Sequence, residues 1–252
     1  MLEAILFDLD GTLLPMDQDL FVKTYLGLLV EHLAPYGYDP GTTMKMLYSG
    51  IGAMVANDGS KNNETVFWDA FRTFFGPREE TDRGIFEEFY ATTFAKARVA
   101  CGVQPEAAGL ISMLKRRGIR CILATNPLFP ATATMQRIRW AGLDASEFEL
   151  VTTYENSSFC KPNPEYYREI LDKTGLRPDQ CLMVGNDARE DVAATKLGMR
   201  VFLLTDCLLH GEEGENHAPR GNFRELTALL ERLTAPEAGE TPVSIENASK
   251  ND

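Results

Sequence analysis

The sequence predicts an α/β fold in which a Rossmann-like, three-layer core with a parallel sheet carries an inserted α-helical domain. Residues 101–234 alternate short apolar runs with helical patterns, and each strand–helix–strand crossover returns the chain to the same end of the sheet, so the strands pair in parallel. One more apolar run, at residues 4–7, is separated from this region by residues 15–100, which show only helical periodicity. We therefore expect a core domain from residues 1–14 and 101–234 and a helical domain from residues 15–100.

The first apolar run ends in two acids, in the sequence Asp8-Leu9-Asp10-Gly11-Thr12. Asp-Gly is a turn signal, so the strand must stop near Asp10. Side chains at i and i+2 of an extended segment share a side, and two like charges there are unfavourable unless a proton or a cation lies between them. A surface turn with both carboxylates in solvent is the alternative. The pattern favours a divalent metal.

The inserted region predicts a bundle of about four helices, because apolar residues recur at helical spacing between breaks rich in Gly, Pro and Asn. The expected helices cover residues 19–33, 42–55, 63–75 and 81–96. Aromatic side chains in the last two are typical of a bundle core. The polar stretch at 57–63 could face a ligand or form an idle loop.

The remaining elements follow in alternation. We expect strands at residues 119–124, 148–151, 181–184 and 200–204, and helices at residues 106–117, 131–140, 164–173, 188–197 and 222–233. Residues 210–221 read as a polar loop, and residues 235–252, rich in Pro, Gly, Ser, Asn and Glu, are typical of a disordered tail.

Composition narrows the function classes. The chain has 37 acidic and 25 basic residues, a formal charge of -12, which disfavours nucleic acid and anionic membranes as partners. Its 5 cysteines are widely spaced and form no Cys-x-x-Cys pair, which fits a reducing compartment. No signal peptide or spanning segment is recognisable. We expect a cytoplasmic protein that acts on a small molecule, while the oligomeric state cannot be read from the sequence.

Further polar residues follow the later strands. They are Thr125 and Asn126 in an Asn-Pro turn, Lys161 before a proline-initiated helix, and the acids Asp187 and Asp191. Each has an ordinary explanation: a turn residue, a solvated lysine, or a helix cap with a partner for the helix dipole. Because parallel strands end at one edge of the sheet, however, these side chains should gather near Asp8 and Asp10. Carboxylate oxygens at one place are what Mg²⁺ prefers.

These motifs resemble, in order and spacing, the four motifs of the haloacid dehalogenase-like hydrolase superfamily, most of whose members are magnesium-dependent phosphatases. Asp8-Leu9-Asp10-Gly11-Thr12 resembles the first motif, Thr125 stands at the position of the second, Lys161 matches the third, and Gly185 to Asp191 looks like the acidic fourth. The resemblance covers about two thirds of the chain, all of it outside the helices of residues 15–100, which would form a cap hinged near 14–17 and 100–103.

The resemblance implies catalytic roles for Asp8, Asp10 and Lys161. Asp8 would be the nucleophile that forms an aspartyl-phosphate, and Asp10 would protonate the leaving oxygen and later activate water. Mg²⁺ would be held by Asp8, Asp187 and the Asp10 carbonyl.

The resemblance also implies which residues bind the phosphate. Thr125, Asn126 and Lys161 would bind the phosphate oxygens, with Asp191 supporting Lys161 or a metal-bound water.

We therefore expect a magnesium-dependent phosphatase that hydrolyses a small organic phosphate monoester. A dehalogenase is disfavoured because it would not need Asp10. A phosphonatase would need a buried cap lysine, for which Lys23, Lys45 and Lys61 are the candidates, and a phosphomutase or a catalytically silent binding module are further alternatives. Sugar phosphates, phosphoglycolate and nucleotides all stay open as substrates, because cap residues choose among them.

Overall fold

The computed structural model describes residues 2–211 and 218–235, so nearly all of the expected tail at 235–252 lies outside the described residues. Within them the core is a sheet of six strands, all parallel, in the order β3-β2-β1-β4-β5-β6. The strands are β1 (Ala4–Phe7), β2 (Arg120–Leu123), β3 (Leu150–Val151), β4 (Cys181–Gly185), β5 (Arg200–Leu204) and β6 (Arg220–Gly221). This confirms the parallel α/β fold.

Strand β1 lies in the centre of the sheet, paired with β2 on one side and β4 on the other. All four of its residues are buried, because neighbouring strands cover its edges and helices cover both of its faces. Pairing with β4 continues past the strand, since the Asp8 amide donates to the Val184 carbonyl (2.8 Å). The first acid of the chain is therefore fixed at the carboxyl end of the central strand.

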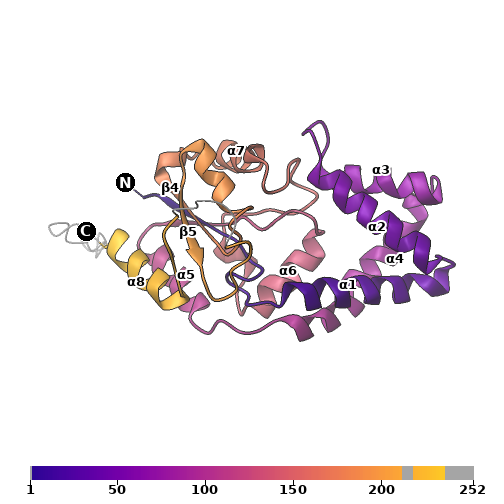
Figure 1. Cartoon of the computed structure of the whole chain (residues 1–252), viewed down its shortest axis with the longest axis horizontal. Coiled ribbons are helices and arrows are strands. Elements are labelled where there is room, and N and C mark those ends of the chain that lie inside the picture. Colours follow the sequence, from indigo (N-terminus) through magenta and orange to yellow (C-terminus); the bar gives the residue numbers. More distant parts are fainter. Residues whose placement is uncertain (1, 212–217, 236–252) are drawn as a thin grey trace, which may run out of the picture.

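The sheet has helices on both faces, which gives three layers (Figure 1), and one apolar cluster lies on each face of the sheet. Ile5 and Phe7 pack with residues of α5 (Ala107–Arg116), α6 (Ala131–Trp140) and α8 (Phe223–Leu233). Ala4 and Leu6 pack with residues of α7 (Pro164–Thr174) and the 3₁₀ helix η5 (Val192–Leu197). The alternation follows from the two-residue period of a strand.

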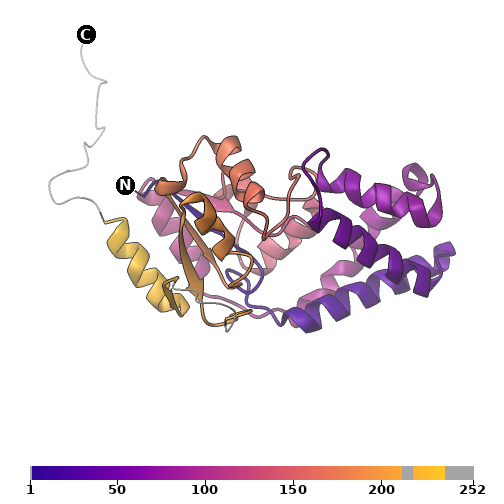
Figure 2. The same cartoon turned by 45° about the horizontal axis from the view of Figure 1, so that its top comes forward.

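Between β1 and α5, the regular elements among the described residues are all helices. They are α1 (Gln18–Leu33), α2 (Pro40–Val55), α3 (Asn63–Phe75) and α4 (Glu79–Ala91), with 3₁₀ turns at Ala34–Tyr36 and Thr93–Ala100. The first three begin where Asp17, Asp39 and Asn62 accept a hydrogen bond from a first-turn amide, as N-cap residues do. These helices gather at one end of the molecule, beside the core (Figure 2).

The two chain segments that connect this bundle to the core pair with each other. The Asp17 amide donates to the Ala100 carbonyl (3.0 Å) and the Gly102 amide to the Pro15 carbonyl (2.7 Å).

The polar stretch at 57–63 makes a third attachment. The Asn63 amide donates to the Ser157 carbonyl (2.9 Å), and its buried side chain reaches the Pro127 carbonyl (3.2 Å). Gly59 has φ +88°, and a Cβ there would lie 2.2 Å from the Phe159 ring. The stretch therefore joins the bundle to the core and is not an idle loop.

Three sequence expectations were wrong in detail. Residues 188–197 do not form an α-helix: the Asp187 side chain takes the amides of Arg189 and Glu190 (2.8 and 3.1 Å), and only the 3₁₀ helix η5 follows. Side-chain bonds to local amides compete with helix formation in this way. The helix expected to reach residue 96 ends at Ala91, and the loop expected at 210–221 contains the two-residue strand β6.

Among the residues described, no helix combines the length and the apolar character needed to cross a membrane.

Candidate active site

Asp8 lies between Lys161 and Thr12 in the turn that follows β1. Its Oδ1 is 2.9 Å from the Lys161 ammonium, and its Oδ2 is 3.3 Å from the Thr12 hydroxyl, which is also 3.1 Å from Asn186 Oδ1. The chain turns at Gly11, whose φ is +84° and where a Cβ would lie 2.2 Å from the Asn186 amide nitrogen. Burial raises the pKa of Asp8 to about 7, against the opposing effect of the Lys161 ammonium.

Lys161 is 1% exposed and donates to two carboxylates. Its Nζ is 2.9 Å from Asp8 and 2.7 Å from Asp191 Oδ1, while Asp191 Oδ2 accepts from the Asp187 amide (2.9 Å). Burial alone would lower the pKa of Lys161, but Asp191 and Asp8 raise it well above its usual value. A buried charge needs partners of this kind, so Lys161 is a fixed ammonium that links the turn after β1 to the turn after β4.

Asp10 pairs with Arg137, a residue of α6 that is 1% exposed. The guanidinium lies over the Phe129 ring, with its carbon 4.4 Å from the ring centroid, and also donates to Thr134 (3.3 Å). Arg137 takes only Oδ2 of Asp10. The other oxygen, Oδ1, is buried and has no hydrogen-bond partner among the described residues, and burial raises the pKa of this carboxyl.

Asp187 serves first as a cap for the turn after β4. Its Oδ1 accepts from the amides of Arg189 and Glu190, and both of its oxygens lie 3.1 Å from His210 Nδ1. The capping role that the sequence offers for this acid is therefore present.

The turn after β2 presents Thr125 and Asn126. The Thr125 carbonyl accepts from Thr152 (2.6 Å) and Tyr166 (2.9 Å), and Thr125 lines the cavity at the strand ends. The Asn126 amide donates to Glu190 (2.9 Å). Burial raises the pKa of Glu190 to about 8.

These turns enclose a cavity of about 130 Å³ at the carboxyl ends of the strands. The lining includes most of the residues singled out in the sequence: Asp8, Asp10, Thr125, Asn126, Asp187 and Asp191. Lys161 is the exception. It lies behind Asp8 and Asp191 and does not reach the cavity wall.

The donor set of this cavity fits a hard cation. Asp8, Asp10 and Asp187, which line it, offer only oxygen, as Mg²⁺ requires. Within residues 2–211 and 218–235, however, no three acidic, His or Cys side chains stand at ligand spacing. The physical reason is that Asp8 and Asp10 are each turned toward a positive charge of the chain itself, Lys161 and Arg137.

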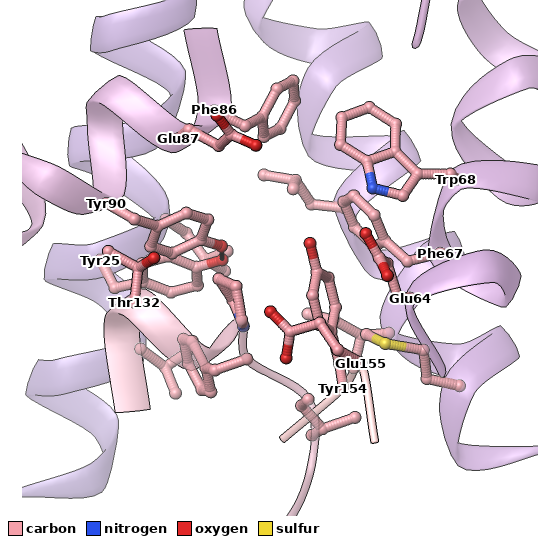
Figure 3. A pocket seen from close by; sticks show the side chains of 18 of the residues that line it. Tyr25, Glu64, Phe67, Trp68, Phe86, Glu87, Tyr90, Thr132, Tyr154 and Glu155 are labelled. Atoms are coloured by element: carbon pink, nitrogen blue, oxygen red, sulfur yellow. Dashed lines mark hydrogen bonds between the residues drawn. The ribbon is translucent and has the colours of Figure 1, made fainter. Parts of the chain in front are cut away.

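A second, larger cavity of about 500 Å³ opens from the first into the helical bundle. The two share Asp10, Gln18, Leu128 and Phe129 in their walls. Figure 3 shows aromatic rings from α1, α3 and α4 around it. The aromatic residues expected to be bundle core are largely buried, but four of them, Phe67, Trp68, Phe86 and Tyr90, also line this cavity.

The sequence interpretation missed several residues of the site. Arg137 could have been found, because it falls between Ala133 and Ile138 on the apolar face of its helix, where a charge needs a partner. Glu190 was in the quoted acidic motif but was given no role. His210 stands in a loop whose sequence carries no signal.

Comparisons with known proteins agree with this geometry. A family model described as haloacid dehalogenase-like hydrolase matches residues 2–197. The chain is 30% identical to a phosphoglycolate phosphatase of Rhodospirillum rubrum, over 98% of this chain and 99% of the relative. It is 28% identical to phosphoglycolate phosphatase 1 of Pseudomonas aeruginosa, over 98% and 85% of the two chains.

A solved structure gives the same fold. The crystal structure of a 2-haloacid dehalogenase from Pseudomonas syringae superposes with a TM-score of 0.62 at 20% identity, over 92% of this chain and 100% of that one. At this identity the likeness concerns the fold alone.

The pair of Asp10 and the buried Arg137 predicts a strong energetic coupling. Arg137→Met should lower the free energy of unfolding by about 3–5 kcal/mol, because it leaves the Asp10 carboxylate, whose side chain is only 18% exposed, without its cation. In Arg137→Met/Asp10→Asn the loss should be much smaller than the sum of the two single changes. Urea denaturation measures this. Arg139→Met, an exposed site on the same helix, should stay within about 0.5 kcal/mol, and additive losses at 10 and 137 would contradict the coupling.

Proposed function

This chain belongs to the haloacid dehalogenase-like hydrolase family, and from that premise we propose that it is a magnesium-dependent phosphatase whose Asp8 is phosphorylated during turnover. Hydrolysis of phosphate monoesters is the activity that its relatives' names indicate. The finer proposal rests on one observation: Asp8 and Asp10 line the same cavity. Lys161 binds one oxygen of Asp8, and Arg137 binds one oxygen of Asp10.

Asp8 is the proposed nucleophile. Its carboxylate attacks phosphorus, the new Asp8–phosphate bond forms, and the bond from phosphorus to the ester oxygen breaks. Lys161 restrains Asp8 through Oδ1 and, with Asp191, keeps the ammonium fixed behind it. Since Lys161 does not line the cavity, it acts in this structure through Asp8, by offsetting negative charge, and not by direct contact with phosphate.

Asp10 is the proposed acid and base. Arg137 holds Oδ2, so the buried and unpaired Oδ1 is the oxygen available for proton transfer. Asp10 gives a proton to the leaving ester oxygen, which departs as the alcohol, and then takes a proton from the water that attacks the phosphorus of the acyl phosphate. Asp10 thereby regains its proton, inorganic phosphate is released, and Asp8 is restored as a free carboxylate.

The phosphate oxygens need donors within the cavity. Thr125 and Asn126 line the cavity, and we assign the Thr125 hydroxyl and an Asn126 amide to orienting the phosphate. Asp8, Asp187 and the Asp10 carbonyl would hold Mg²⁺, which would supply positive charge to offset the repulsion between a carboxylate and a phosphate.

The competing activities find less support. A dehalogenase would have no use for an acid at Asp10. Lys23, Lys45 and Lys61 are all exposed, and Lys61 pairs with Asp69 (2.7 Å), so none of them suits the buried amine of a phosphonatase.

Removing the nucleophile should abolish turnover. We expect Asp8→Asn to lower kcat toward p-nitrophenyl phosphate with Mg²⁺ by at least about 10³-fold, because the covalent route has no substitute. Circular dichroism should show an unchanged fold. A variant that kept its activity would refute the role of Asp8, and a chain that cleaved no phosphate ester would favour a silent binding module.

Asp10→Asn should separate the two steps. p-Nitrophenolate leaves readily without protonation, whereas water attack needs a base, so stopped-flow absorbance should show a burst near one equivalent and then a slow phase. Acid-quenched protein should carry alkali-labile phosphate. Slow linear release with no burst would mean that Asp10 is not required for the second step.

Metal removal gives a further expectation. Chelation with EDTA should abolish turnover and Mg²⁺ should restore it. Asp187→Asn should raise the Mg²⁺ concentration for half-maximal activity by at least about tenfold, the scale of an impaired metal site. Asp179→Asn, an exposed acid of the core, should leave that concentration unchanged, and undiminished activity in EDTA would exclude metal dependence.

A further inference from the structure

The large cavity is the place where the organic part of a substrate must lie. It measures about 500 Å³, against about 130 Å³ for the cavity at Asp8. The two share four lining residues, including Asp10, the proposed proton donor to the leaving oxygen. A phosphate bound at Asp8 therefore directs its ester oxygen past Asp10 toward the bundle. This placement of the leaving group rests on the proposed function.

Aromatic side chains form a large part of the wall of this cavity. Six of them surround it in Figure 3: Tyr25, Phe67, Trp68, Phe86, Tyr90 and Tyr154. They come from α1, α3, α4 and the loop after β3. Such a wall binds apolar area well and gives little to a short polar group. A two-carbon leaving group would leave most of the cavity unfilled.

The charges of the wall exclude a second anion. Arg83 is the one Lys, Arg or His among the described lining residues, and it is committed to Glu64 and to the face of Trp68, 4.7 Å from the ring centroid. Glu87 and Glu155 also line the cavity and enter no ion pair among the described residues. Glu155 accepts from the Ala131 amide (2.8 Å). A carboxylate on the leaving group would meet repulsion and no spare cation.

We propose that this cavity selects phosphate monoesters whose leaving group is bulky, largely apolar and free of negative charge, and that it discriminates against small anionic esters such as 2-phosphoglycolate. The selectivity arises from the wall of the large cavity, which bundle helices and the core loops carrying Phe129 and Glu155 form together. The chain would then differ in substrate from the relatives named for phosphoglycolate.

The test compares kcat/KM of the magnesium-loaded chain for four esters. We expect 1-naphthyl phosphate to exceed 2-phosphoglycolate by at least about tenfold, and phenyl phosphate to exceed 4-carboxyphenyl phosphate, a pair that differs by one carboxylate. Phosphoglycolate turnover equal to or above that of naphthyl phosphate would overturn this inference and leave the proposed function intact. No turnover of any ester would overturn both.

A charge reversal tests whether the acidic side chains of the cavity wall contribute to substrate selection. Glu87→Lys introduces a cation at an exposed position of the wall and should raise kcat/KM for 4-carboxyphenyl phosphate relative to phenyl phosphate by about three- to tenfold. Glu31→Lys is the matched control, because it is also exposed near the end of a bundle helix but does not line this cavity. Equal ratios in the two variants would show that the wall charges do not select the substrate.

Discussion

The ammonium of Lys161, held between Asp8 and Asp191, is the interaction on which the site depends. A lysine at 1% exposure is tolerated only because two carboxylates neutralise it. Those carboxylates follow β1 and β4, which are neighbours in the sheet. A shift in register between β1 and β4 would therefore separate Lys161 from one of its carboxylates. The charge balance of the site thus depends on the pairing of these two central strands.

Asp10 is also paired with a cation of the chain, Arg137 of α6. The Arg137 guanidinium packs over the Phe129 ring, which lines both cavities. One side chain therefore packs against the cation that pairs with Asp10 and also lines the larger cavity. The two cavities are linked by this packing, so a change at Phe129 affects both.

The bundle is attached to the core at three places along the chain. Besides the paired connections at Asp17 and Gly102, the start of α3 bonds to the loop after β3. Closure of the larger cavity by rigid rotation about the first two connections alone would break the hydrogen bonds of Asn63. In this structure the bundle is therefore joined to the core by more than the two connecting segments, and both parts contribute side chains to the wall of the larger cavity.

The sequence by itself determined the parallel α/β core, the helical bundle between its first two strands and the acids at the strand ends, because apolar period and turn residues are local signals. It also marked Lys161, through the order of the motifs. Only the tertiary structure decided that Arg137 meets Asp10, that Glu190 enters the site and that the bundle aromatics enclose a cavity as well as a core. Arg137 and Asp10 are 127 positions apart in the sequence, and Glu190 and Asn126 are 64 positions apart. No local pattern specifies which buried charge or ring meets which distant partner.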